Sequence, residues 1–451
     1  MKLNLRQFFQ AVNPAKTLDY AKADDRQYYI DFTPVRGSQL IQQLKRTITW
    51  SDSPRTCQLF TGHIGCGKST ELLRLKNELE EEGFHVVYFE SSQDMDMADV
   101  DISDILLAIA HQVSHSLELV GIQLKPTRFQ NLLKGAADLL NSNVTGFQVG
   151  IPNVGNVGIN AEEDNYSLSV GIGEITTKAR NSRDVRTLLR EYTEPRVNVI
   201  LEAMNHDLIE SAQKQLQQRG KAGLVVIVDN LDRIDNRTRM TGRTTSEYLF
   251  VDRGEQLNQL YCHIVYTIPL ILTFSNDLGS LTNRFASDPQ LLPMVRTHER
   301  DGSLCEEGIE LLRQMILARA FPSLEPEKRY TLIPEIFDEI ETLDRLCLVS
   351  GGHVRNLLVL LSNCLKRDEP PFSRRTIERV IAQRRNDLVK AITPEEWELL
   401  RQVRQYKSVR GEQEYQTLLK SLFVFEYRDD DEGSWFDINP ILLEVKELNS
   451  Y

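Results

Sequence analysis

The sequence predicts an α/β fold built on a parallel β-sheet, and three features of the chain support this class. The first is a glycine-rich stretch, TGHIGCGKST at 61–70, which lies between a short apolar run and an amphipathic run. The second is the β-branched run LVVIV, which ends at Asp229. The third is the alternation of short apolar runs, such as HVVYFE, with longer runs of helical periodicity, which is typical of βαβ units.

The glycine-rich stretch fits the pattern G-x-x-x-x-G-K-[ST]. The run CQLF before it reads as a strand and TELLRLKNELEEEG after it reads as a helix, which is the context that a phosphate-binding loop requires. Glycines let backbone N–H groups approach phosphate oxygens without a Cβ clash, and the helix N-terminus adds partial positive charge. We therefore predict an ATP-binding loop made of Gly62, His63, Ile64, Gly65, Cys66, Gly67, Lys68, Ser69 and Thr70.

The side chains that follow the glycines predict the chemistry of the loop. Lys68 can reach the β and γ phosphates of ATP, and Ser69 can ligate Mg²⁺. Asp229 falls at the C-terminal end of an apolar strand, the edge at which open α/β sheets bind ligands. We predict Ser69 and Asp229 as the magnesium site, with Lys68 and Asp229 in catalytic roles. His63 and Cys66 occupy variable positions of the pattern, and we assign no chemical role to their side chains.

With these two motifs the chain resembles the AAA+ and STAND branches of P-loop ATPases, over about residues 30–390. The segment DNLDR at 229–233 is similar to the D-D-L-D-R signature of STAND-like and KAP-type ATPases. In that family an acid after the magnesium aspartate polarises the attacking water, whereas this chain has Asn230. An amide can orient water but cannot take its proton, so we expect slow hydrolysis. Asp232 is the candidate substitute; alternatively it pairs with Arg233 or caps the next helix.

The resemblance also implies residues that sense the γ-phosphate. CHIVYTIPLILTFSND at 262–277 is similar to the sensor-1 strand of Orc/Cdc6-like AAA+ proteins, with Asn276 as the sensing residue and Ser275 or Thr273 as alternatives; SND could equally be a turn. SGGHVRNLLVLLSNCLKR at 350–367 is similar to the sensor-2 pattern, which makes Arg355 a catalytic candidate, unless it is a solvated helix residue.

Two further positions follow from the same resemblance. Arg284 is a candidate arginine finger, although most such arginines are ordinary surface charges. Val35, Arg36 and Gly37 resemble the segment that precedes the phosphate-binding loop in Orc/Cdc6 and STAND chains, where they would lie near adenine.

The chain divides into four predicted regions: a lead-in (1–50), an ASCE-type ATPase core (51–300), a helical lid (301–391) and a winged-helix-like module (392–451). Lys68 and Asp229 are 161 positions apart, so we expect an insertion at about 121–220. Polar and apolar residues alternate on both sides of EEDN, which predicts a glycine-rich β-ribbon at 146–179 between two helical arms. Such a ribbon is marginal alone, so we expect it to contact another subunit or protein; alternatively it packs on its own domain.

The predicted winged-helix-like module has the order helix, helix, hairpin, a class that often binds DNA. Residues 371–451 carry 13 Lys/Arg and 15 Asp/Glu, a net charge of −2, and the hairpin tip reads RDDDEG. Because duplex binding depends on neutralising phosphates, this surface favours a protein partner over DNA. The basic stripe of the lid is a solvated face or a weak nucleic-acid contact; it consists of Arg374, Arg375, Arg384 and Arg385.

Composition sets the broader limits. The chain has 451 residues, 41% of them hydrophobic and 26% charged, with a net charge of −12. It has no apolar run of membrane-spanning length, no signal-peptide pattern and no C-x-x-C pair, so we expect a cytoplasmic protein without membrane contact. The sequence thus favours a Mg²⁺-dependent ATPase switch that forms a homo-oligomer or binds a protein. The alternatives are an Orc/Cdc6-like or transposition-type ATPase that assembles on DNA, and a nucleotide-binding structural protein.

Overall fold

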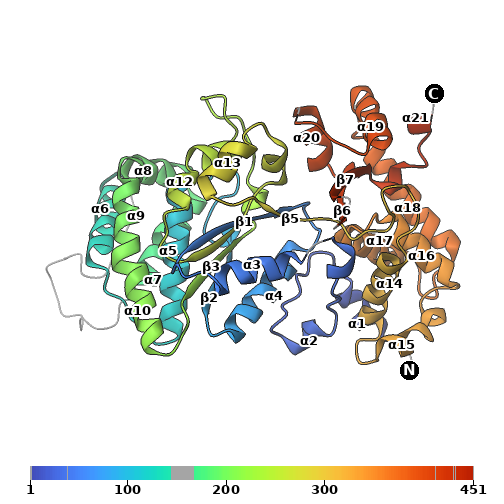
Figure 1. The fold of residues 1–451 in the computed structure, drawn as a ribbon, viewed down its shortest axis with the longest axis horizontal. Helices are drawn as coiled ribbons and strands as arrows, with labels where there is room; N and C mark the ends of the chain where they lie inside the picture. Colours follow the sequence, from blue (N-terminus) through green and yellow to red (C-terminus); the bar gives the residue numbers. More distant parts are fainter. Residues whose placement is uncertain are drawn as a thin grey trace.

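The computed structural model describes residues 3–37, 39–143, 167–411, 413–429, 431 and 433–449. A five-stranded sheet forms its centre, with the strand order β2-β3-β4-β1-β5 and every pairing parallel (Figure 1). The predicted α/β fold with a parallel-sheet core is therefore confirmed. The strands are β1 (Thr56–Gly62), β2 (His85–Glu90), β3 (Leu224–Asp229), β4 (His263–Thr267) and β5 (Gln290–Leu292).

Strand β3 lies inside the sheet, and all six of its residues are buried, as are all residues of β4. Its side chains alternate between two apolar layers: Val225 and Ile227 join one cluster, whereas Val226 and Val228 join the other. The register pairs Glu90 with Asp229, so the ends of β2 and β3 coincide. Because the strands are parallel, β1, β3 and β4 all end at one edge of the sheet.

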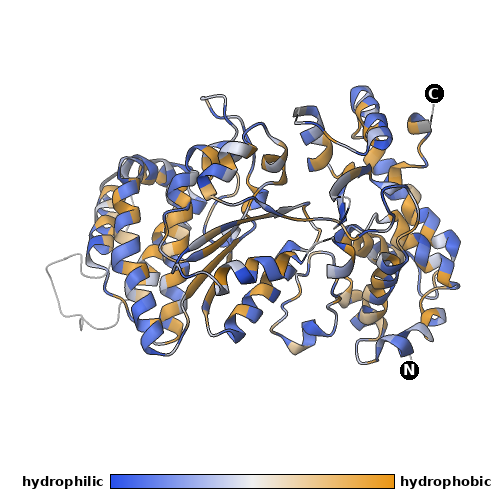
Figure 2. Cartoon of the chain, in the orientation of Figure 1, coloured by the Kyte–Doolittle hydropathy of each residue, from blue (hydrophilic) through white to orange (hydrophobic). Residues whose placement is uncertain are grey.

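Amphipathic helices cover both faces of the sheet, with apolar residues turned inward (Figure 2). The layer that contains Val225 also contains residues of α3 (Leu40–Thr49) and α4 (Lys68–Glu81). The opposite layer contains residues of α5 (Ile102–Leu119) and of the helices inserted before β3. These inserted helices are α6 (Thr127–Asn143), α7 (Leu168–Asn181), α8 (Arg183–Thr193), α9 (Val197–Ala203) and α10 (Glu210–Gln218), with the π-helical turn η4 (Met204–Ile209) between the last two.

The β-ribbon predicted at 146–179 is wrong in the part that the structure describes, because Leu168–Asn181 is helical. The side chain of Ser167 caps this helix by accepting a hydrogen bond from Val170 N–H. Leu168 and Ile172 are buried at helical spacing, whereas Val170, which strand alternation would place on the same face, is 48% exposed. The other residues of the predicted ribbon, 146–166, lie outside the described residues.

One glycine of the predicted ribbon, Gly173, serves close helix packing. A Cβ on Gly173 of α7 would lie 2.7 Å from Nε2 of His111 on α5, which is closer than real Cβ contacts. Helices α5 and α7 accordingly pack tightly against each other. A glycine in a helix costs stability relative to alanine, and the close contact explains why it is present here.

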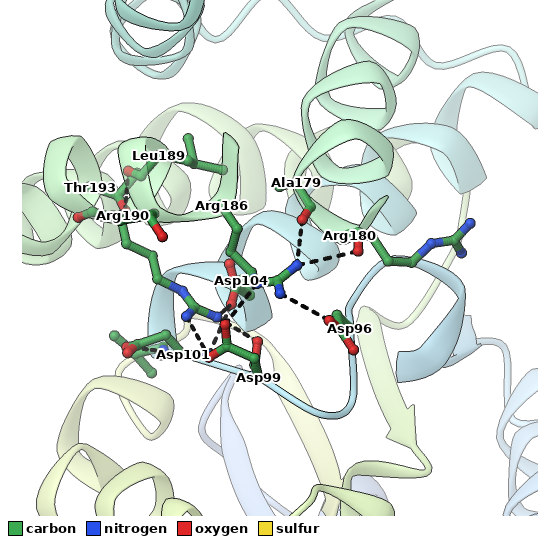
Figure 3. Close-up of polar contacts among 12 residues, drawn as sticks. Asp96, Asp99, Asp101, Asp104, Ala179, Arg180, Arg186, Leu189, Arg190 and Thr193 are labelled. Atoms are coloured by element: carbon green, nitrogen blue, oxygen red, sulfur yellow. Dashed lines mark hydrogen bonds and ion pairs between the residues drawn. The ribbon is translucent and has the colours of Figure 1, made fainter. Parts of the chain in front are cut away.

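A cluster of ion pairs connects helix α8 of the inserted helices to the loop that follows β2 (Figure 3). Arg186 of α8 bonds Asp96 at 2.9 Å and Asp99 at 3.0 Å, and Arg190 bonds Asp99 at 2.7 Å. These aspartates belong to the loop between β2 and α5. The same loop accepts a hydrogen bond from Asp235 N–H, which follows β3, at 2.9 Å through Met97 O.

Short helices flank these elements. Before β1 come α1 (Leu5–Ala11), α2 (Ala23–Arg26) and the 3₁₀ turn η1 (Thr33–Val35), and η2 (Ser91–Gln93) follows β2. Between α8 and β5 lie η3 (Glu194–Arg196), η5 (Leu231–Arg233), α11 (Thr245–Glu247), η6 (Tyr248–Asp252), α12 (Gly254–Leu257), η7 (Leu270–Phe274) and α13 (Leu278–Phe285).

The chain after β5 forms a third apolar cluster, together with Phe8, Val12, Phe32 and Val35 of the N-terminal segment. Helices come first, and a two-stranded antiparallel hairpin follows near the end. The helix, helix, hairpin order predicted for the C-terminal region is present, and Thr393 and Glu396 form the predicted capping box. The elements are α14 (Glu306–Ala320), α15 (Pro326–Tyr330), η8 (Ile333–Glu335), α16 (Ile340–Val349), α17 (Val354–Arg367), α18 (Arg374–Val389), α19 (Pro394–Tyr406), α20 (Gln413–Lys420), β6 (Val424–Asp429), β7 (Gly433–Ile438), η9 (Pro440–Leu442) and α21 (Lys446–Asn449).

The expectations about membrane-spanning segments and about disulfide bonds can be compared with the described residues. Within them, no helix combines the length and the apolar character needed to cross a bilayer. All six cysteines are free thiols, as their scattered spacing predicted.

Candidate functional site

The glycine-rich loop connects β1 to α4 in the predicted strand, loop, helix arrangement. Gly62, Gly65 and Gly67 have φ angles of +149°, +89° and +111°, which favour glycine. Close contacts reinforce the requirement, because a Cβ on Gly65 would lie 2.9 Å from both the Cβ of Arg355 and the Cε1 of His353. The loop is therefore shaped by its own backbone and by the helices that pack on it.

Lys68 is held inside the loop by three partners. Its Nζ donates to Gly62 O at 2.8 Å and to His63 O at 2.9 Å, and it lies 2.9 Å from Oδ2 of Asp232. Burial alone would lower the pKa of Lys68, but Asp232, Cys66 and Asp229 together more than offset this and the pKa is raised. The ammonium group is therefore charged and aimed at the place where the loop would hold phosphates.

The predicted magnesium ligands lie together. The Asp229 carboxylate accepts hydrogen bonds from Tyr88 OH at 2.7 Å and from Asn230 N–H at 2.7 Å. Burial raises the pKa of Asp229, and the neighbouring Ser69 hydroxyl opposes that rise. A hydroxyl and a carboxylate are hard oxygen donors, the type that Mg²⁺ combines with phosphate oxygens and water. The residues present therefore fit a magnesium ion.

The turn after β3 directs Asp232 inward. Asn230 is 4% exposed and left-handed, with φ +65°, a conformation that asparagine tolerates better than most residues. The next residue, Leu231, donates its N–H to the Thr267 hydroxyl at 2.9 Å. As a result, Asp232 is buried against Lys68 rather than paired with Arg233, and its Oδ1 has no hydrogen-bond partner.

The lid contributes Arg355, as the resemblance implied. Its N–H donates to Gly65 O at 3.2 Å, and its side chain lines the same cavity as the glycine-rich loop. Burial and the neighbouring positive charge of Arg233 lower the pKa of Arg355, while Asp232 opposes them. Two guanidinium groups thus share one cavity wall with Lys68, a concentration of positive charge suited to a polyphosphate.

Two histidines that carried no predicted chemistry connect the loop to the lid and to the C-terminal hairpin. His353 donates from Nε2 to Ile64 O at 2.8 Å, because its Nδ1 accepts from Asn356 N–H at 2.9 Å. His63 accepts at Nε2 from Glu426 N–H of β6 at 3.1 Å. Burial lowers the pKa of His353 to about 4 and that of His63 to about 3, so both rings are neutral.

The cavity extends from the loop to the N-terminal segment and the lid. The N-terminal segment and the lid helices α14 and α17 contribute mainly apolar and aromatic side chains to its wall, with a lysine, a threonine and an arginine: Pro14, Lys16, Thr17, Leu18, Tyr28, Ile30, Phe32, Met315, Arg319 and Leu358. Of the three residues expected near adenine, only Arg36 lines the cavity. It lies at the phosphate end instead, where its Nη2 donates to Cys66 O at 2.7 Å.

The structure does not bring Asn276 to this cavity. The apolar run 262–277 is not one strand, because β4 ends at Thr267 and the 3₁₀ turn η7 follows. Pro269 has no N–H with which to continue the ladder. The polar residue at the end of β4 is Thr267, which is fully buried and bonds the turn after β3. Arg284 lies exposed on α13, and its finger role stays a prediction.

Comparison with known proteins agrees with this geometry. Residues 38–250 match the family model of the KAP family P-loop domain. No curated protein sequence matches the chain. Among solved structures, a Walker-type ATPase of Pyrococcus abyssi shares 13% identity and a TM-score of 0.40, covering 97% of this chain and 99% of its own. The Aeropyrum pernix Orc2 protein, in ADPNP–ADP complexes, shares 11% identity and a TM-score of 0.41, and the match covers 100% of this chain and 97% of that protein.

A third similar structure is the Aeropyrum pernix Orc1 protein in complex with DNA, at 12% identity and a TM-score of 0.37, covering 97% of this chain and 96% of its own. At these TM-scores the three structures support no argument about the function of this chain. The family match and the loop geometry support nucleotide binding together with a divalent metal.

Proposed function

Because residues 38–250 carry a P-loop domain of the KAP type, we propose that the chain is an ATP-binding, slowly hydrolysing switch. The observation that supports this most is the meeting of three regions at one loop. The core supplies Lys68 and Asp232, the lid supplies His353 and Arg355, and the C-terminal hairpin supplies Glu426. Each region bonds directly to the glycine-rich loop or to a side chain of it.

Phosphate binding would use the positive groups around this loop. Lys68 bonds two loop carbonyls and Asp232, and γ-phosphate oxygens would compete with that carboxylate for its ammonium group. Arg233 and Arg355 line the same cavity and repel each other, so a polyanion between them would relieve the repulsion. Mg²⁺, when bound by Ser69 and Asp229, would supply positive charge to the phosphates.

Hydrolysis would depend on Asp232, because Asn230 cannot accept a proton. Oδ2 of Asp232 lies against Lys68, while the buried Oδ1 has no partner and is available to accept a hydrogen bond from water. We therefore assign proton acceptance to Asp232.

The switch itself would act through the two neutral histidines. His353 bonds Ile64 O and stacks on Phe425, with ring centroids 5.6 Å apart, while His63 bonds Glu426 N–H. A movement of the loop on phosphate binding would therefore reach the lid and the C-terminal hairpin at once. We propose that the nucleotide thereby changes assembly or contacts with a protein partner.

The basic stripe of the lid gives little support to a DNA-binding role. Arg374 bonds Glu378 at 2.8 Å, and Arg385 bonds Glu444. These pairs neutralise two of the four arginines that the sequence pointed out.

The direct test is ATP turnover combined with molar mass by light scattering. The protein would be measured with Mg²⁺ and either ADP, ATP or a non-hydrolysable ATP analogue, alongside Lys68→Ala. We expect slow phosphate release and a mass or shape that differs between ADP and the analogue, both lost in the variant. Fast turnover with identical mass and shape in both nucleotides would contradict the proposal.

A further inference from the structure

One buried cation in the cavity has no role in the phosphate site. Arg319 of α14 is only 4% exposed and lines the same cavity as the glycine-rich loop, near Tyr28 of the N-terminal segment. Its Nη1 donates to Met315 O, one turn back in the same helix, at 2.9 Å, and its Nε has no hydrogen-bond partner. Burial lowers the pKa of Arg319 to about 10, and only the nearby Tyr28 acts in the opposite direction.

The surroundings supply no anion to balance this charge. The residues that the N-terminal segment and the lid add to the cavity wall are mostly apolar or aromatic, for example Leu18, Phe32 and Leu358. The acidic and amide side chains that line the cavity belong to α4 and to the turn after β3, and none of them acts on the pKa of Arg319: Glu71, Asn230 and Asp232. Burying an arginine that has one carbonyl acceptor and no anion is costly, so a ligand that supplies further acceptors would bind there favourably.

A nucleotide whose phosphates lie on the glycine-rich loop would direct its nucleoside toward the wall that the N-terminal segment and the lid add to the same cavity. Nucleobases and ribose present acceptor atoms, and the planar fork of arginine matches paired acceptors such as those on a base edge. We propose that Arg319 is a specificity-determining residue that hydrogen-bonds to the nucleoside of the bound nucleotide. This inference rests on the proposed function and adds to it the residue that recognises the part of the ligand beyond the phosphates.

The chain provides a matched control. Arg329 is also buried, at 7% exposure, and also has a partnerless Nε, but it is not part of the cavity wall. Its Nη2 donates to a backbone carbonyl, that of Pro322, at 3.4 Å. Removing this arginine therefore reproduces the loss of a buried cation without touching the nucleotide site.

The test compares Arg319→Met, Arg319→Lys and Arg329→Met with the unmodified protein. Calorimetry with Mg²⁺ would measure affinity for ATP, GTP and inorganic tripolyphosphate, and thermal unfolding without ligand would record stability. We expect Arg319→Met to weaken ATP binding by at least about tenfold while tripolyphosphate changes less than about twofold. Arg319→Lys keeps the positive charge but not the planar guanidinium, so its ATP affinity should lie between those of Arg319→Met and the unmodified protein. Arg329→Met should leave the affinities for ATP and tripolyphosphate unchanged.

The nucleotide arms identify which part of the nucleoside is contacted. A changed ratio of ATP to GTP affinity in Arg319→Met assigns the contact to the base, and an unchanged ratio assigns it to the ribose. An equal loss for ATP and tripolyphosphate, or no loss for either, overturns the inference. If the unmodified protein binds neither nucleotide nor tripolyphosphate, the proposed function fails as well, so the two failures are distinguishable.

Discussion

Replacing Asp232 with asparagine removes the negative charge opposite Lys68 and changes little else. The two side chains are 4% and 6% exposed and lie 2.9 Å apart, so the change acts on a buried ion pair. Removing one partner of such a pair costs about 3–5 kcal/mol when the other is left alone. Lys68 keeps two carbonyl acceptors here and gains an amide oxygen, so we expect a smaller loss of unfolding free energy, about 1.5–3 kcal/mol.

The effect on turnover should be much larger than the effect on binding. An amide cannot accept the proton of the attacking water, so Asp232→Asn should reduce the rate of ATP hydrolysis by about 10²–10⁴. ATP affinity should stay within about threefold, because Lys68 still lies between the carbonyls of Gly62 and His63.

Three measurements check this prediction: phosphate release at saturating ATP, calorimetry with a non-hydrolysable analogue, and urea unfolding. Asp235→Asn is the matched control, because Asp235 follows in the same turn but is partly exposed and pairs with Arg237. If Asp232→Asn is folded, binds ATP and hydrolyses it at the unmodified rate, the assignment of the base is refuted. Asn230→Glu should then speed hydrolysis by restoring the acid typical of the family.

Three other predictions concern the same loop. Lys68→Ala should weaken ATP binding by at least about tenfold, about 1.4 kcal/mol by calorimetry; near-normal affinity would remove Lys68 from the site. Arg355→Ala should leave ADP affinity nearly intact but abolish the ATP-specific change in shape, and an equal loss for both nucleotides would make the residue structural. The pKa of His353 is about 4 in the folded protein, whereas an exposed histidine has a pKa of 6.5. The unfolded chain therefore binds a proton at this histidine more tightly than the folded protein does. As a result, the contribution of His353 to stability falls as the pH drops from about 6.5 to about 4. Over that pH range, urea titrations should show a steeper loss of unfolding free energy in the unmodified protein than in His353→Gln, by about 1.4 kcal/mol per pH unit. Plots of unfolding free energy against pH that run parallel for the two proteins would contradict this prediction.

Local sequence patterns predicted the parts of the site that depend on backbone geometry. Gly62, Gly65 and Gly67 have positive φ angles, and only a short glycine-rich pattern between a strand and a helix satisfies that requirement. Asp229 was placed correctly because a buried β-branched run has a clear end. Arg355 was found by its spacing from Gly352, and the structure places it on the cavity wall.

The failures arose where local pattern and tertiary structure diverge. The apolar run after β4 continues beyond Pro269, so the sequence alone suggested Asn276 rather than Thr267 as the last strand residue. Residues 168–172 alternate like a strand but pack as a helix, because Gly173 lets α7 approach α5 closely. Nothing near Arg319 in the sequence separates it from other helix arginines, since its burial depends on the N-terminal segment.

The central claim is that a nucleotide bound to the core changes the hydrogen bond between the glycine-rich loop and the C-terminal hairpin. Amide hydrogen exchange measures this change most directly. The Glu426 N–H, bonded to His63, would be followed together with the N–H of Arg355, bonded to Gly65 O. With Mg²⁺, the account predicts that exchange at both amides differs between ADP and a non-hydrolysable ATP analogue, and that the difference disappears in Lys68→Ala. Exchange at Glu426 that is identical in the two nucleotides, in a protein shown to bind both, would contradict the account.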